Sequence, residues 1–165
     1  MIEQFRITPM PLFLMALFFF SPVSASPHAD KINALLAMQQ APVGVVFEIA
    51  SGDANALQWV IPKIQEYTRL LRKKFPGLEV AVVTHGQEQF ALQQEKQAEY
   101  QKVHDSVKEL SEQENVPVHI CQTFAGWKGV EPEEFPKYVS VSATGPQQVN
   151  DYVDLGYTLI KIRRP

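Results

Sequence analysis

The chain has 165 residues, and its 15 lysines and arginines against 18 aspartates and glutamates give a net charge of -3. Nucleic-acid binding requires a basic face, so this mild acidity argues against a nucleic-acid partner. One cysteine and four histidines are present. A lone cysteine excludes an internal disulfide bond, and no two of these residues have CxxC or HxxxH spacing, so we expect neither a metal nor another cofactor.

The first 25 residues have the features of a secretory signal peptide. An apolar run over 10–20 follows Arg6 and leads to Val23-Ser24-Ala25, which fits the small-residue rule for signal cleavage. A retained membrane anchor is the alternative, but the run is shorter than the roughly 20 apolar residues that span a bilayer. We therefore predict a signal peptide over 1–25 and one mature domain over 26–165. That domain would be exported, to the periplasm in a Gram-negative bacterium, without stable membrane insertion.

Short runs rich in β-branched residues predict five strands, and three- and four-residue apolar spacing predicts helices between them. The predicted strands are Val43–Ala50, Leu78–Thr84, Val116–Cys121, Tyr138–Ala143 and Tyr157–Ile162. The predicted helices are Ala29–Gln39, Asn55–Lys74, a surface helix with an apolar stripe from Tyr100 to Leu110, and one within Gly145–Gly156. This alternation predicts a single α/β domain with a mainly parallel five-stranded sheet and helices on both faces.

Pro62 interrupts the second predicted helix. Proline removes a backbone hydrogen bond inside a helix, so either this helix is kinked or its regular part begins near Ile61.

Polar residues gather where the predicted strands end. In open parallel sheets, ligands bind outside the carboxyl ends of the strands. The residues placed there are Asp53, Asn55, His85, Cys121, Gln122, Thr123 and Thr144, and His119 shares a strand face with Cys121.

Cys121 has two interpretations. A thiol just before a helix receives unpaired N–H donors, which stabilise the thiolate and would make Cys121 a nucleophile. Free cysteine is also among the most frequently buried residues, so Cys121 could simply pack in the core. Its position alone does not separate the two.

The segment around the cysteine resembles a known family. Val118-His-Ile-Cys-Gln-Thr-Phe-Ala-Gly-Trp-Lys-Gly-Val130, followed by Glu131-Pro-Glu-Glu-Phe135, is similar to the cysteine segment of the DsrE/DsrF sulfur-relay family, which includes the TusD subunit. The matching features are a strand ending in an apolar residue and cysteine, a short helix of small residues, and then basic, glycine and acidic positions. The opening strand and the closing strand–helix–strand also resemble this family.

The resemblance implies a carrier that holds sulfane sulfur as a persulfide on Cys121. It also implies sulfur-donor and sulfur-acceptor proteins or small thiols as partners, and a homo-oligomer, either a trimer or a hexamer. Established members of the family are cytoplasmic, whereas this chain is predicted to be exported. The alternative is a non-catalytic oligomeric module that binds a small ligand or a partner, with Cys121 as a buried structural residue.

Overall fold

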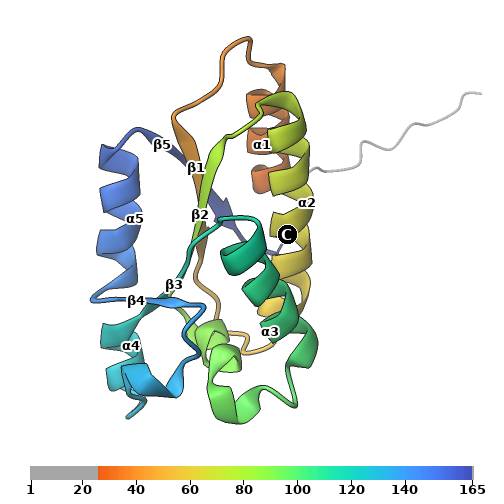
Figure 1. Ribbon diagram of the computed structural model, residues 1–165. Helices are drawn as coiled ribbons and strands as arrows, with labels where there is room; N and C mark the ends of the chain where they lie inside the picture. The colour runs from red at the N-terminus through yellow and green to blue at the C-terminus, as the bar shows by residue number, and fades with distance from the viewer. Residues whose placement is uncertain (1–25, 165) are drawn as a thin grey trace, which may run out of the picture.

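The computed structural model describes residues 26–164, which contain one five-stranded sheet (Figure 1). All strand pairs are parallel, and the order is β4-β3-β2-β1-β5. The strands are β1 (Gly44–Ile49), β2 (Glu79–Thr84), β3 (Val118–Cys121), β4 (Ser140–Ser142) and β5 (Tyr157–Ile162). The predicted α/β fold is confirmed, and the sheet is entirely rather than mainly parallel.

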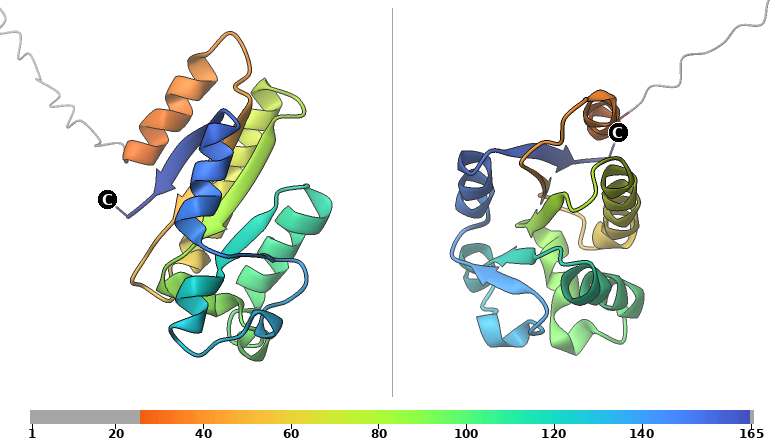
Figure 2. Two further views of the ribbon diagram at one scale, coloured as in Figure 1. Left: turned by 90° about the vertical axis from the view of Figure 1, so that its left-hand side faces the viewer. Right: turned by 45° about the horizontal axis from the view of Figure 1, so that its top comes forward.

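Helices cover both faces of the sheet, as the two views in Figure 2 show. On one face lie α1 (Pro27–Ala37), α2 (Leu57–Lys74) and α3 (Gln101–Lys108). On the other face, α5 (Gly145–Asp154) crosses the sheet and the five-residue helix α4 (Gln122–Gly126) lies below it.

The interior strand β1 has a continuous apolar run because it is covered on both faces. Phe47 belongs to the large core beneath α1, α2 and α3, whereas Val46 belongs to the smaller core beneath α5. Both side chains are fully buried. A strand covered on both faces needs apolar residues at successive positions, and this is the pattern that the sequence shows.

The helix α2 begins at Leu57 and contains Pro62. The interpretation in which its regular part begins near Ile61 is therefore wrong. Pro62 lies on the exposed side of the helix, while Ile61 and Ile64 face the core. The apolar stripe thus holds α2 in place across the position where proline removes one internal hydrogen bond.

The chain leaves neighbouring strands in different directions at the carboxyl edge of the sheet. After β1 it leads to α2, and after β2 it passes through a 3-10 helix, η1 (Gln87–Leu92), toward α3. After β3 it turns into α4, on the α5 side (Figure 2). The connections that follow β2 and β3 therefore leave toward opposite faces of the sheet, and Cys121 lies where they separate.

The predicted signal peptide lies outside the described residues. Within residues 26–164, no helix is long and apolar enough to cross a membrane.

Candidate functional site

Cys121 is the last residue of β3 and the N-cap of α4. Its Sγ accepts a hydrogen bond from the backbone N–H of Phe124 at 3.4 Å. The residue is only 4% exposed. The structure thus combines the two sequence-based interpretations, because the sulfur is buried and also receives a helix N-terminal donor.

The neighbours of Cys121 on its face of the sheet are polar. The register of β3 and β4 places Ser142 directly beside Cys121. His119 lies two residues earlier on the same strand and therefore on the same face, which is the face covered by α5.

A hydrogen-bond network accounts for both ring nitrogens of His119. Nε2 lies 2.9 Å from the hydroxyl of Tyr152, and Nδ1 lies 3.1 Å from Oγ of Ser142, which donates to Gln148. Since that serine proton is used on Gln148, Nδ1–H donates to Ser142, and in the neutral ring Nε2 accepts from Tyr152. The network therefore suits a neutral imidazole, and burial also lowers the pKa of His119.

His85 belongs to a separate charged cluster on the same face. Its Nε2 lies 3.0 Å from a carboxylate oxygen of Glu48, and Nζ of Lys161 lies 2.9 Å from the other oxygen. Burial alone would raise the pKa of Glu48, but its hydrogen bonds and charge interactions with Lys161 and His85 outweigh burial and lower it. A Cβ added at Gly145 would lie 2.3 Å from Cβ of His85, so the first turn of α5 packs directly on this histidine.

No protein-family model and no curated protein matches this chain. Among solved structures, its fold is similar to that of MTH1491, a protein of unknown function from Methanobacterium thermoautotrophicum. The TM-score is 0.57 at 17% identity, over 72% of this chain and 97% of the other. A likeness at this identity supports the α/β fold and carries no assignment of function.

Two buried side chains lie between the ends of β2 and β3. The sequence did not indicate either of them as a site residue. Glu88 and Gln89 follow β2 in η1, and both are fully buried. Gln89 makes two hydrogen bonds to the backbone of Cys121. Glu88 accepts from backbone N–H groups of Ser51 and Gly86 and from the hydroxyl of Thr84.

Three further predicted site residues shape the turns around Cys121. Gln122 is exposed in the first turn of α4. Thr123 donates through its backbone N–H and its hydroxyl to the carbonyl of Ala143, which ties α4 to the end of β4. Thr144 caps α5 by accepting the N–H of Gln147.

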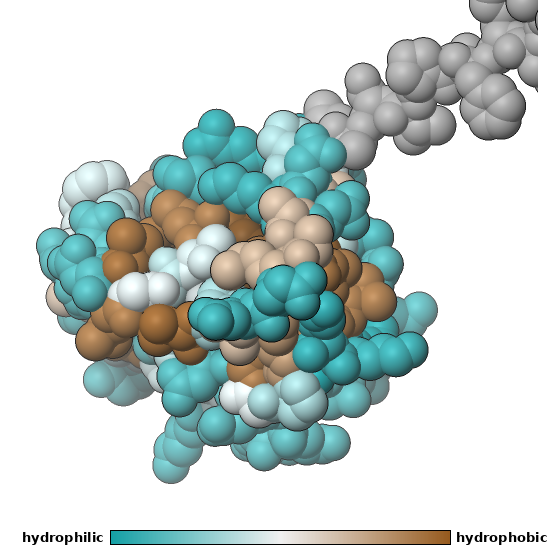
Figure 3. Space-filling view, turned by 90° about the horizontal axis from the view of Figure 1, so that it is seen from above, coloured by the Kyte–Doolittle hydropathy of each residue, from teal (hydrophilic) through white to brown (hydrophobic). Residues whose placement is uncertain are grey.

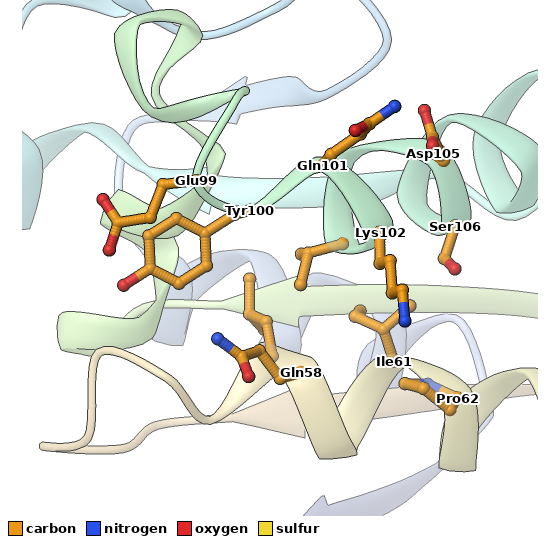
Figure 4. A pocket seen from close by; sticks show the side chains of 11 residues that line it. Gln58, Ile61, Pro62, Glu99, Tyr100, Gln101, Lys102, Asp105 and Ser106 are labelled. Atoms are coloured by element: carbon orange, nitrogen blue, oxygen red, sulfur yellow. The ribbon is translucent and has the colours of Figure 1, made fainter.

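Asp53 and Asn55 lie on the other side of the sheet from the thiol. The side chain of Asn55 accepts a hydrogen bond from Tyr100 at 3.1 Å, and Tyr100 lines a pocket of about 640 Å³ between α2 and α3 (Figure 4). The pocket has an apolar floor and a polar rim. Its lining residues are Leu57, Gln58, Ile61, Pro62, Glu99, Tyr100, Gln101, Lys102, Val103, Asp105 and Ser106. The structure therefore does not bring all the predicted site residues together.

The amino-terminal end of the sheet has an apolar surface, which Figure 3 shows from above. Val43, just before β1, and Leu155, at the end of α5, are 64% and 67% exposed. A Cβ added at Gly156, the residue after Leu155, would lie 3.3 Å from Cγ2 of Val43, so the end of α5 and the start of β1 are neighbours here. This surface is at the opposite end of the strands from Cys121.

Within residues 26–164, no group of three or more histidine, cysteine, aspartate or glutamate side chains could hold a metal ion.

We expect acidification below about pH 6.5 to destabilise the folded protein. Burial lowers the pKa of His28, His104 and His119 from the usual 6.5, so the unfolded chain binds protons more readily. Their neutral forms stabilise the fold above this pH, and that stability is lost as the pH falls through and below it. Glu48, with its lowered pKa, adds a further loss under more acidic conditions. Urea unfolding at about pH 7.5 and about pH 5.5 measures the effect, and equal or greater stability at the lower pH would contradict it.

Proposed function

We propose that this protein is exported to the periplasm and carries sulfane sulfur as a persulfide on Cys121, in the manner of the DsrE-like sulfur-relay proteins. The observation that carries the proposal is the hydrogen bond from the Phe124 N–H to Sγ at the start of α4. A donor held at the sulfur favours the thiolate, which is the nucleophilic form of cysteine. The cysteine segment that resembles the family supports the same activity.

The reaction needs one cysteine and no cofactor. The Cys121 thiolate attacks the outer sulfur of a donor persulfide, R–S–SH, and forms a new S–S bond. The S–S bond of the donor breaks, and the donor leaves as the thiolate R–S⁻. Cys121 then holds the persulfide, and a second thiolate can remove the outer sulfur by the same exchange, so no external oxidant or reductant is required.

Access to the sulfur involves the side of α4. Phe124 is half-buried, and its ring lies between Phe90 of η1 and the exposed Trp127, with centroid separations of 5.6 and 6.1 Å. Trp127 is 77% exposed. A donor that approaches Cys121 from the side of α4 would meet this aromatic group.

The proposed partners are sulfur-donor and sulfur-acceptor proteins or small thiols. Exposed tryptophan is enriched among residues that dominate protein interfaces, so Trp127 suits contact with a protein carrying the sulfur. We also propose a homo-oligomer, a trimer or hexamer. The apolar surface around Val43 and Leu155 would allow subunits to associate without covering the cysteine end.

Incubation with glutathione persulfide, followed by removal of excess reagent, should raise the intact mass by one sulfur atom per chain. The gain should be absent from the Cys121→Ser variant and reversed by dithiothreitol, because a persulfide is reducible. Failure of folded wild-type protein to gain sulfur under conditions where the unfolded chain does gain it would refute the proposal.

The 4% exposure of Cys121 favours a second candidate, a non-catalytic module in which this cysteine packs and a small ligand or partner binds elsewhere. The pocket between α2 and α3 would then be the binding site. Alkylation of the folded protein separates the two candidates, since a buried protonated thiol reacts slowly and an accessible thiolate rapidly.

A further inference from the structure

The ladder between β2 and β3 ends one residue before the cysteine. The last paired residues are Thr84 and Ile120. Beyond them, the backbone N–H of Gly86 turns to the carboxylate of Glu88, at 2.9 Å, instead of continuing along β3. The backbone of Cys121 therefore has no paired residue on β2, although β3 lies between β2 and β4 in the sheet.

The side chain of Gln89 takes the place of the missing strand residue. Its Oε1 accepts the N–H of Cys121 at 2.8 Å, and its Nε2 donates to the carbonyl of the same residue at 3.3 Å. A carboxamide carries both an acceptor and a donor, so it can satisfy both backbone groups of one residue. These two bonds hold Cys121 extended, with φ -95° and ψ 110°, at the point where α4 begins.

Gln89 is itself held firmly. The preceding residue, Glu88, is bonded to the loop after β1 and to the end of β2, with distances of 2.8 Å to Ser51 N and 2.6 Å to Thr84 Oγ1. The following residue, Phe90, is buried in the main core. The carboxamide therefore reaches Cys121 from a fixed backbone, which a mobile surface glutamine could not do.

We propose that Gln89 is the positioning residue of the Cys121 thiol, an inference that rests on the proposed persulfide chemistry. By fixing the backbone of Cys121, Gln89 keeps Sγ on the N–H of Phe124. Loss of either carboxamide bond allows the start of α4 to shift and weakens that donor contact. Gln89 acts through the backbone of Cys121 and does not touch the reacting sulfur.

The test compares Gln89→Met with Gln94→Met. Methionine has a similar length and no carboxamide, so Gln89→Met removes both bonds while keeping most of the volume. Gln94 is a matched control, because its carboxamide donates to the backbone carbonyls of Glu133 and Phe135, at 2.8 and 3.1 Å, away from the thiol. The rate of reaction with iodoacetamide and with glutathione persulfide is measured across pH, together with the free energy of unfolding.

We expect the pH of half-maximal rate to rise by about 1 in Gln89→Met, which is about a tenfold smaller thiolate population at pH values well below the midpoint, and to stay unchanged in Gln94→Met. A purely structural role would lower stability without moving this midpoint, so an unchanged midpoint in folded Gln89→Met overturns the inference. If Gln89→Met does not fold, Gln89→Asn is used, because its shorter carboxamide cannot reach both groups. Its midpoint should also rise, and an unchanged value would overturn the inference.

The two proposals fail separately. Wild-type protein that gains no sulfur from glutathione persulfide contradicts the carrier function, while the iodoacetamide midpoints still report on Gln89. Wild-type protein that gains sulfur, with a midpoint insensitive to Gln89, contradicts only the positioning role.

Discussion

Replacing Glu88 with alanine should lower the free energy of unfolding by about 3–5 kcal/mol. The carboxylate is fully buried and accepts hydrogen bonds from Ser51 N, Gly86 N and Thr84 Oγ1. Its removal leaves three donors without their partner in a closed part of the protein, and each unsatisfied donor is costly. Chemical denaturation monitored by circular dichroism measures the loss.

Two further variants test the reason for this loss. Glu88→Gln keeps the shape but turns one acceptor oxygen into a donor group, so we expect an intermediate loss of about 1–3 kcal/mol. Glu95→Ala removes an exposed glutamate from the same segment and should change stability by no more than about 0.5 kcal/mol. Equal effects of Glu88→Ala and Glu95→Ala would show that the buried contacts do not stabilise the fold.

The strands could be predicted from the sequence because the sheet is covered on both faces. The sequence predicts Tyr157–Ile162 with the observed bounds, and it predicts each of the three interior strands one or two residues longer than observed. Their continuous β-branched runs are a local signal. The fourth strand shortens to Ser140–Ser142, because two of its three side chains are exposed and its apolar pattern is weaker.

The position of Cys121 at a strand end, before a helix, was also predictable, since the apolar run stops there and small residues follow. The structure confirms this placement and gives the burial that the pattern could not. Whether a residue at the sheet edge faces solvent depends on the segments packed beyond it. Here those segments are α4 and η1.

The residues that close the edge were not predictable from local pattern. Gln87-Glu-Gln89 has the composition of a solvated surface segment, yet Glu88 and Gln89 are fully buried. Polar side chains become buried when specific partners satisfy them, and those partners lie at or just after the ends of β1, β2 and β3. The one available signal was Gly86, where a Cβ would lie 2.4 Å from both the Ser51 carbonyl and the Glu88 carboxylate.

The predicted site residues fall into two separate groups because the chain leaves the carboxyl edge of the sheet toward two different faces. The sequence places Asn55 and Cys121 at the carboxyl ends of strands, and both do lie there. The chain after β1, however, turns toward α2, whereas the chain after β3 turns toward α4. Strand order and the direction of each connection decide which residues meet, and neither is a local property of the sequence.

Replacing Phe47 with alanine should cost about 3–5 kcal/mol, comparable with the loss of Glu88 but for a different reason. Phe47 is fully buried in the interior strand β1 and stacks on Tyr67 of α2, with ring centroids 6.3 Å apart. Tyr67 in turn lies 6.0 Å from the ring of His28 in α1. The substitution leaves a cavity beneath two helices, and both lose packing at once.

The position of Phe47 also predicts where the structure will loosen. Hydrogen exchange in Phe47→Ala should quicken in α1 and in the first half of α2 more than in α5, because α5 packs on the other face of the sheet. Phe47→Leu, which keeps much of the volume, should lose about 1–2 kcal/mol. Leu155→Ala, at a position 67% exposed, should lose no more than about 0.5 kcal/mol. A uniform increase in hydrogen exchange on both faces of the sheet would contradict this expectation and indicate that the two cores are one cooperative unit. A loss of unfolding free energy below about 1 kcal/mol in Phe47→Ala would contradict the stacked arrangement of β1, α2 and α1.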